Sequence, residues 1–189
     1  MIRIGILGDI GSGKSHVARN FRRPIFNADL EVSKLYKKDR KIFYKLKRVL
    51  PKYIYSFPIN KNEVLNAILS NKNNLKKIIK IVHLEIRKKL NVFLSKNRNK
   101  KIVILDIPLL LENKMNNKND ILIFVQSKKS DILKRLRNRQ NFNLKLLTKF
   151  RNIQLSLDYK KKKSNFVIKN NFTNASIKKD IKIILNEIL

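Results

Sequence analysis

The stretch Gly8-Asp9-Ile10-Gly11-Ser12-Gly13-Lys14-Ser15 follows a short apolar run, residues 2–7, and opens a helical pattern over residues 14–21. It matches G-x-x-x-x-G-K-[ST] at every defined position, and a strand before it with a helix after it is the context that this motif requires. Glycines let the backbone adopt positive φ angles, so that amide groups and the helix start face an anion closely. The stretch predicts a nucleoside-triphosphate site, in which Lys14 reaches the β- and γ-phosphates and the Ser15 hydroxyl joins a Mg²⁺ shell.

Strands and helices alternate outward from this loop. Apolar runs of strand length occupy residues 24–27, 102–107, 121–125 and 166–168, and helical patterns occupy residues 73–94, 130–139, 144–159 and 177–188. Continuous apolar runs are typical of a parallel sheet that is buried on both faces. The alternation therefore predicts a three-layer α/β fold. Together with the phosphate loop it predicts the P-loop nucleoside-triphosphate hydrolase type.

Acidic residues stand at the ends of two predicted strands. Ligands bind at the carboxyl ends of parallel strands, so Asp29 and Asp106 are candidates for chemistry next to the phosphate loop. Asp29 could accept a proton from an attacking hydroxyl or orient it, and it is equally suited to cap a helix. Asp106 could hold a Mg²⁺-bound water or lie at a solvated strand end. Glu112 follows as a cap, a water-mediated metal ligand or a solvent-facing charge.

The formal net charge is +32 over 189 residues. The 33 lysines, 24 asparagines and 26 isoleucines share A/T-rich codons, so a biased genome accounts for most of the charge. The run from Lys160 to Lys163 is expected to form a solvated face. Part of the charge could still attract an anionic partner, which could be a nucleic acid, a phosphorylated metabolite or a membrane surface.

The composition excludes several classes of site. The chain has no cysteine, which excludes disulfides, thiolate metal sites and a cysteine nucleophile. His16 and His83 are the only histidines, so a zinc site with three histidine ligands is excluded too. The longest apolar stretch, residues 102–111, is interrupted by Asp106 and falls short of the roughly 20 residues that span a bilayer. We expect a cytoplasmic protein with no membrane segment.

Taken in order along the chain, these motifs resemble the dephospho-coenzyme A kinase family. The resemblance runs through nearly the whole sequence, and it is carried by Gly5 to Ser15, Ala28-Asp29, Val82 to Arg87, Leu105 to Asn113, Arg137 to Gln140, Gln154, and Phe166 to Asn170. It implies transfer of the ATP γ-phosphate to the ribose 3′-hydroxyl of dephospho-coenzyme A. It also implies one kinase domain with a core (about 1–29, 99–136 and 151–189), a helical acceptor-binding insert (about 30–98) and a lid (about 137–150).

The resemblance also implies residue roles. Asp29, Lys14 and Arg139 match the catalytic positions, with Asp29 at the acceptor hydroxyl and Arg139 at the transferring phosphate. ATP binding is implied for Gly8, Gly11, Ser12, Gly13, Lys14, Ser15, His16 and Asn170, and acceptor binding for His83, Arg87, Pro108 and Glu112. Ser15 and Asp106 match the positions around Mg²⁺. The implied partners are ATP and dephospho-coenzyme A, with no stable nucleic-acid partner, no membrane, and a monomer or weak oligomer.

The chain departs from the family pattern at several positions. Asp9 replaces a glycine of the loop, Asn27 replaces the first acid of a D-A-D triplet, and Lys61, Leu84 and Lys149 replace an arginine, a proline and an arginine. Lysine keeps the charge of arginine but loses its planar, bidentate fork. Two alternatives stay open: a small P-loop kinase with a nucleotide or small-alcohol acceptor, and a basic nucleic-acid-binding protein regulated by ATP.

Overall fold

The computed structural model describes residues 1–138 and 142–189 and forms two compact units. The first, here called the sheet unit, comprises Met1–Asn27, Leu94–Phe142 and Ile153–Leu189. The second, the helical unit, comprises Ala28–Phe93 and Asn143–Asn152. The chain therefore leaves the sheet unit after β2 and returns to it near the end of α5.

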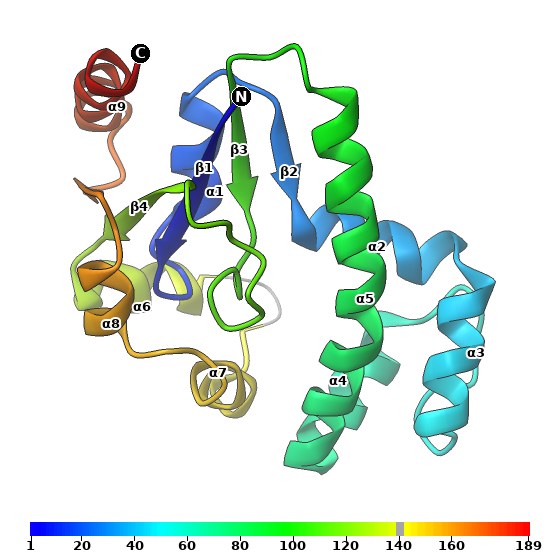
Figure 1. Cartoon of the computed structure of the whole chain (residues 1–189). Helices are drawn as coiled ribbons and strands as arrows, with labels where there is room; N and C mark the ends of the chain where they lie inside the picture. The colour runs from blue at the N-terminus through cyan, green and yellow to red at the C-terminus, as the bar shows by residue number, and fades with distance from the viewer. Residues whose placement is uncertain (139–141) are drawn as a thin grey trace. The chain divides into compact units, whose positions relative to one another are not determined.

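Parallel strands build the sheet unit, as the continuous apolar runs predict (Figure 1). Among the described residues the sheet has the order β2-β3-β1-β4-β5, formed by β1 (Ile2–Gly8), β2 (Ile25–Asn27), β3 (Ile102–Asp106), β4 (Ile121–Gln126) and β5 (Phe166–Lys169). The order reverses direction at β1, because β2 and β3 lie on one side of it and β4 and β5 on the other. Ligands bind at such a switch point in parallel sheets, and the phosphate loop follows β1 directly.

Apolar layers cover both faces of this sheet. On one face Ile4 and Ile6 pack with Ile104 and Ile123 against α1 (Lys14–Asn20) and α9 (Asn174–Ile188). On the other face a Cβ at Gly5 would lie 2.5 Å from Leu110 Cδ2, so the segment after β3 packs tightly on the central strand. The three-layer prediction is confirmed, and burial on both faces explains why the strands read as unbroken apolar runs.

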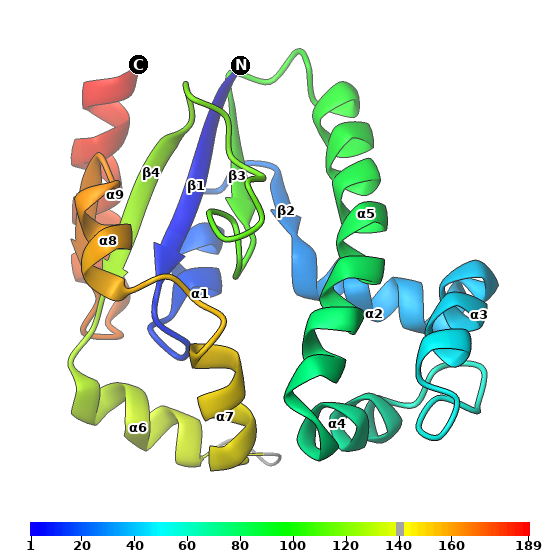
Figure 2. The same cartoon turned by 60° about the horizontal axis from the view of Figure 1, so that its bottom comes forward.

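Helices build the helical unit (Figure 2). They are α2 (Ala28–Lys38), α3 (Arg40–Val49), α4 (Lys61–Ser70), most of α5 (Lys72–Lys96) and α7 (Leu144–Arg151). Side-chain oxygens of Asp39, Asn60 and Asn143 accept backbone hydrogen bonds at the starts of α3, α4 and α7, where the first amides lack helical partners.

One helix prediction is wrong. The pattern over residues 144–159 indicates a single helix, but the structure forms α7 and a separate α8 (Leu157–Lys162). Leu155 N donates to Glu112 Oε1 at 3.0 Å, so this amide does not make the hydrogen bond that a continuous helix would require. Ser156 then begins α8, because its Oγ accepts a hydrogen bond from Tyr159 N at 3.2 Å. A partner distant in sequence overrides the local periodicity here.

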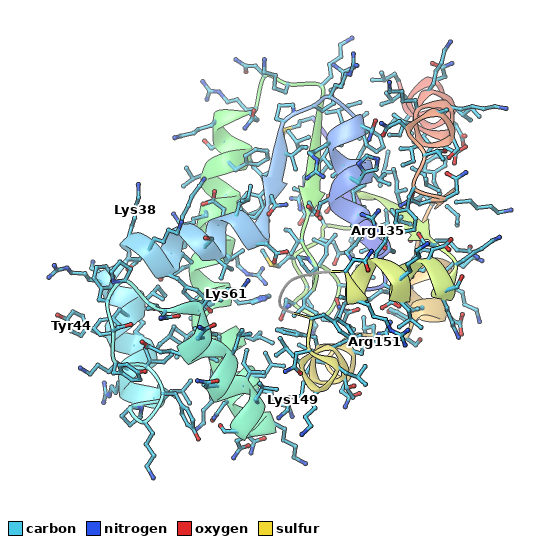
Figure 3. The ribbon with its side chains drawn as sticks, turned by 180° about the vertical axis from the view of Figure 1, so that it is seen from behind. Lys38, Tyr44, Lys61, Arg135, Lys149 and Arg151 are labelled. Atoms are coloured by element: carbon cyan, nitrogen blue, oxygen red, sulfur yellow. The ribbon has the colours of Figure 1, made fainter. Side chains whose placement is uncertain are left out.

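Cationic side chains dominate the surface. Figure 3 shows lysine and arginine side chains extending outward from helices of both units, Lys38 among them. The few carboxylates are shared between them: Glu85 lies 3.0 Å from Lys88 Nζ and 3.7 Å from Lys45 Nζ. In the described part of the chain, no helix is both long and apolar enough to cross a membrane.

Candidate active site

The phosphate loop is built by three glycines with positive φ. Gly8, Gly11 and Gly13 have φ values of 143°, 88° and 90°, which side chains with a Cβ rarely adopt. Packing requires glycine as well: a Cβ at Gly8 would lie 2.6 Å from the Val125 carbonyl oxygen, and one at Gly13 would overlap the Asn170 amide. The loop thus turns from β1 into α1 with its backbone open to an anion, as the motif predicts.

Lys14 begins α1 and folds back over the loop. Its Nζ donates to the carbonyl oxygens of Asp9 at 2.7 Å and Gly8 at 3.1 Å, which holds the ammonium group at the phosphate-binding turn. Ser15 is half-buried one residue further along the helix. His16 N caps the first turn by donating to Gly13 O at 2.9 Å, while its Nε2 is buried without a partner among the described residues.

Asn170 anchors the loop from the end of β5. Its Nδ2 donates to Ser12 O at 2.8 Å, and its Oδ1 accepts from Phe172 N at 2.8 Å. Ser127 Oγ donates to the same Ser12 oxygen at 2.9 Å. The side chain of Asn170 is only 3% exposed, so it supports the loop from beneath. The adenine role expected for Asn170 stays a prediction.

An aromatic contact lies beside this anchor. The Arg135 guanidinium sits 4.1 Å from the centroid of the Phe172 ring, within the range of a cation–π interaction. A Cβ at Gly13 would lie 3.2 Å from Phe172 Cε1, so this ring borders the loop. Sequence reasoning missed Arg135, Phe172 and Ser127, because no motif links them to the loop and only the fold brings them there.

Asp106 lies at the carboxyl end of β3, where a Mg²⁺-associated acid is expected. It is 3% exposed, and its Oδ2 accepts a hydrogen bond from Asn27 Nδ2 at 2.6 Å. Asn27, which replaces an acid of the family pattern, therefore serves as a hydrogen-bond donor to this carboxylate. No cluster of three metal-ligating side chains exists among residues 1–138 and 142–189. The donors available here are a hydroxyl and a carboxylate, which suit Mg²⁺ held chiefly by phosphate and water.

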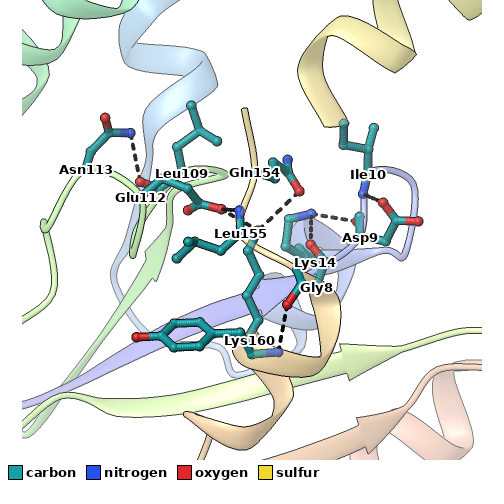
Figure 4. A network of polar contacts seen from close by, with 12 residues as sticks. Gly8, Asp9, Ile10, Lys14, Leu109, Glu112, Asn113, Gln154, Leu155 and Lys160 are labelled. Carbon is teal, nitrogen blue, oxygen red and sulfur yellow. Dashed lines mark hydrogen bonds and ion pairs between the residues drawn. The ribbon is translucent and has the colours of Figure 1, made fainter. Parts of the chain in front are cut away.

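Glu112 joins a buried ion pair in the sheet unit (Figure 4). Its Oε1 lies 2.7 Å from Lys160 Nζ, and the two side chains are 9% and 1% exposed. Lys160 also donates to Gln154 Oε1 at 3.1 Å. The prediction that Lys160 belongs to a solvated face is wrong: Lys161, Lys162 and Lys163 are exposed, but Lys160 turns inward to neutralise Glu112. Pro108, which precedes this segment, is half-buried in the turn after β3.

The remaining acceptor-side residues lie in the helical unit. Asp29 is exposed in the first turn of α2, one residue past the helix start, so it is not the cap of that helix. Asp29 and His83 line the same cavity of about 660 Å³. Burial lowers the pKa of His83 below 6.5, and the nearby Arg87 charge lowers it further. Arg87 lies exposed one turn along α5. Arg139 lies outside the described residues.

The strand order and the phosphate loop together place the chain in the class of P-loop kinases. The family model for dephospho-CoA kinase matches residues 2–176. A dephospho-CoA kinase from Wolbachia pipientis wMel is 30% identical over 98% of this chain and 97% of that protein.

Solved structures agree with this fold. TT1252 from Thermus thermophilus aligns with a TM-score of 0.80 and 25% identity, covering 100% of this chain and 98% of that one. A dephospho-CoA kinase from Campylobacter jejuni aligns with a TM-score of 0.64 and 20% identity, covering 98% and 96%.

The chain belongs to the dephospho-CoA kinase family. It is accordingly a phosphotransferase that uses ATP.

Proposed function

We propose that this protein transfers the γ-phosphoryl group of ATP to the ribose 3′-hydroxyl of dephospho-CoA, which gives coenzyme A and ADP. The observation that carries the proposal is the family match over residues 2–176, in a chain whose phosphate loop has the backbone that phosphate binding needs. Phosphoryl transfer depends on positioning and charge neutralisation more than on covalent chemistry. Each residue of the site therefore acts through the charge or hydrogen bond that it can supply.

The sheet unit supplies the nucleotide side of the reaction. Amides of the phosphate loop, from Gly8 through Ser15, bind the β- and γ-phosphates, and Lys14 neutralises their charge. Ser15 and Asp106 would hold Mg²⁺, which would supply charge neutralisation when bound. Asn170 supports the loop by hydrogen-bonding the Ser12 carbonyl oxygen. The buried Nε2 of His16 is a polar atom that can hydrogen-bond the nucleotide.

The helical unit supplies the acceptor side. Asp29 accepts a hydrogen bond from the ribose hydroxyl and orients it, and it can take the proton as the phosphoryl group transfers. His83, held neutral near pH 7 by its lowered pKa, can hydrogen-bond the acceptor through either ring nitrogen. Arg87 adds positive charge one turn away. Arg139, in the region assigned as a lid, is proposed to meet the transferring phosphate.

The remaining assignments follow from the same reaction. Pro108 and Glu112 are assigned to acceptor binding, and the ion pair with Lys160 positions the Glu112 side chain in the segment after β3. The substrates are cytoplasmic metabolites, so we place the protein in the cytoplasm. We expect a monomer or weak oligomer without a stable nucleic-acid partner, since the reaction needs neither a second chain nor a polyanion.

The acceptor is tested by ADP release from ATP and Mg²⁺. Dephospho-CoA should stimulate release strongly and yield coenzyme A, while adenosine, AMP and shikimate should not. Stimulation by one of the control acceptors instead would overturn the substrate assignment and leave the P-loop kinase class intact. The pattern across acceptors therefore separates this proposal from that of a kinase with a small-alcohol substrate.

Asp29→Asn tests the acceptor-side chemistry. The amide keeps the shape of the carboxylate but cannot take a proton, so kcat should fall about 10²-fold or more while ATP affinity stays unchanged. Asp158→Asn is the matched control, because Asp158 is also an exposed acid in the first turn of a helix. A turnover near that of the unaltered protein would remove Asp29 from the reaction.

A further inference from the structure

The last residues of two neighbouring strands form a polar pair in the sheet unit. Asn27 ends β2 and Asp106 ends β3, and the two are paired in the parallel register of these strands (Figure 1). Neighbouring strands lie about 4.8 Å apart, so the amide and the carboxylate leave the sheet next to each other. They do so at the carboxyl ends of the strands, the edge at which the phosphate loop follows β1.

Asn27 determines how this carboxylate is presented. Its Nδ2 donates to Asp106 Oδ2 at 2.6 Å. Asp106 is 3% exposed, and within the part of the chain that the structure describes its side chain accepts no other hydrogen bond and forms no ion pair. An ionised carboxylate has about four acceptor sites. The amide therefore fixes one oxygen and leaves Oδ1 for a donor that these residues do not supply.

The pair also sets the charge at this edge of the sheet. Asparagine and aspartate have nearly the same shape, but asparagine is a neutral donor, whereas an acid at position 27 would add a second negative charge about one strand spacing away. The affinity of an oxygen-ligand site for a divalent cation rises with the charge of its ligands. With Asn27 in place, this pair supplies one negative charge, and an ion needs phosphate oxygens to complete its shell.

We propose that Asn27 is a positioning residue for Mg²⁺. It fixes the Asp106 carboxylate so that Oδ1 is left for the water shell of the ion, and its neutral amide makes binding of the ion depend on the nucleotide. The inference rests on the proposed function, which assigns Asp106 to Mg²⁺. Loss of a group that orients a metal-binding side chain typically lowers metal affinity by about 10- to 100-fold, so the contribution of Asn27 is large enough to measure.

The alternative is that the hydrogen bond only joins two strands. β2 has three residues and lies at the edge of the sheet, so a side-chain bond to β3 would stabilise it. That role predicts a loss of stability when the amide is removed, with equal effects on nucleotide binding in the presence and in the absence of Mg²⁺. A positioning role predicts a loss that is confined to the Mg²⁺-dependent part of binding.

Calorimetric titration with the β,γ-imido analogue of ATP separates the two roles. The affinity is measured with Mg²⁺ and again with EDTA, and the ratio of the two affinities is the Mg²⁺ enhancement. Asn27→Leu keeps the size of the side chain and removes the donor. The enhancement should fall about tenfold or more, while the affinity in EDTA stays within about twofold. Thermal unfolding establishes that each variant is folded.

Asn27→Asp tests the charge at this edge. The probe is Mn²⁺ without nucleotide, measured by the electron paramagnetic resonance signal of the free ion. The variant should bind Mn²⁺ about tenfold more tightly than the unaltered protein, because two carboxylates then face the ion. Asn186→Asp is the matched control, since Asn186 is an exposed asparagine on α9 and its replacement lowers the net charge equally. It should leave the affinity for Mn²⁺ unchanged.

Two results would overturn the inference. One is a Mg²⁺ enhancement that is unchanged in a folded Asn27→Leu variant, or a loss that is equal with Mg²⁺ and with EDTA. The other is an affinity for Mn²⁺ that is no higher in Asn27→Asp than in Asn186→Asp.

Asp106→Asn is the reference variant and should lose the Mg²⁺ enhancement. If it retains the enhancement, the assignment of Asp106 to Mg²⁺ fails and this inference fails with it. Failure of the acceptor assignment looks different, because dephospho-CoA would then not stimulate ADP release. The binding measurements contain no acceptor, so they would keep their expected values in that case.

Discussion

The side chain of Lys160 is buried although it opens a run of four lysines. Its ammonium group lies 2.7 Å from Glu112 Oε1 and 3.1 Å from Gln154 Oε1. These contacts compensate for the hydration that the Lys160 ammonium group loses on burial, which costs an isolated ion several kcal/mol. The pair therefore connects the segment after β3 to the middle of α8.

Lys160→Met should destabilise the protein by about 3–5 kcal/mol, because Glu112 would remain buried with an uncompensated charge. The measurement is urea unfolding. Lys161→Met is the matched control, since Lys161 is exposed in the same helix, and should change stability by no more than about 0.5 kcal/mol.

The double variant Glu112→Gln with Lys160→Met removes both charges and keeps an acceptor for Leu155 N. It should recover at least half of the loss. Equal stabilities for Lys160→Met and Lys161→Met would mean that the buried pair contributes nothing to the folded state.

At the scale of elements, the end of β5 supports the phosphate loop at the end of β1. Asn170 joins them through Ser12 O, and its backbone N donates to Gln126 O of β4 at 2.7 Å. Ser127, just after β4, adds a second donor to Ser12. The loop is thus fixed by two neighbouring strands as well as by its own glycines.

Asn170→Ala should lower stability by about 1–3 kcal/mol and weaken ATP binding, because Phe172 N loses its acceptor and Ser12 O loses a donor. Unfolding without nucleotide and the KM for ATP are measured together. Lys169→Ala, an exposed neighbour on β5, is the control. Weaker ATP binding at unchanged stability would instead assign Asn170 to direct contact with the nucleotide.

At the scale of the whole molecule, the net charge of +32 acts on stability. Like charges repel one another in the compact state, and salt screens exposed charges over about 10 Å at 0.1 M. The cations extend outward from many elements (Figure 3), which fits a charge that comes from composition more than from one binding surface.

Raising NaCl from 50 to 500 mM should therefore raise Tm, by roughly 2–4 °C for each kcal/mol of repulsion that is screened. Chloride is used because sulfate or phosphate would also bind the phosphate loop. A Tm that stays constant or falls would show that screening of local ion pairs, such as Glu85 with Lys45 and Lys88, offsets the relief of repulsion.

The sequence by itself determined the phosphate loop, the parallel sheet and the family. The roles of Gly8, Gly13 and Lys14 can be predicted because a phosphate-binding turn needs particular residue types at a fixed short spacing. The strands can be predicted because buried parallel strands need unbroken apolar runs. These are local constraints, so a single sequence carries them.

Tertiary structure decided what depends on distant partners. The break between α7 and α8, the burial of Lys160, and the contact of Asn170 with Ser12 each join residues far apart in the chain. The cavity that Asp29 and His83 line exists only because four helices of the helical unit enclose it. Local patterns report propensity and spacing, whereas burial and pairing depend on which segments the fold brings together.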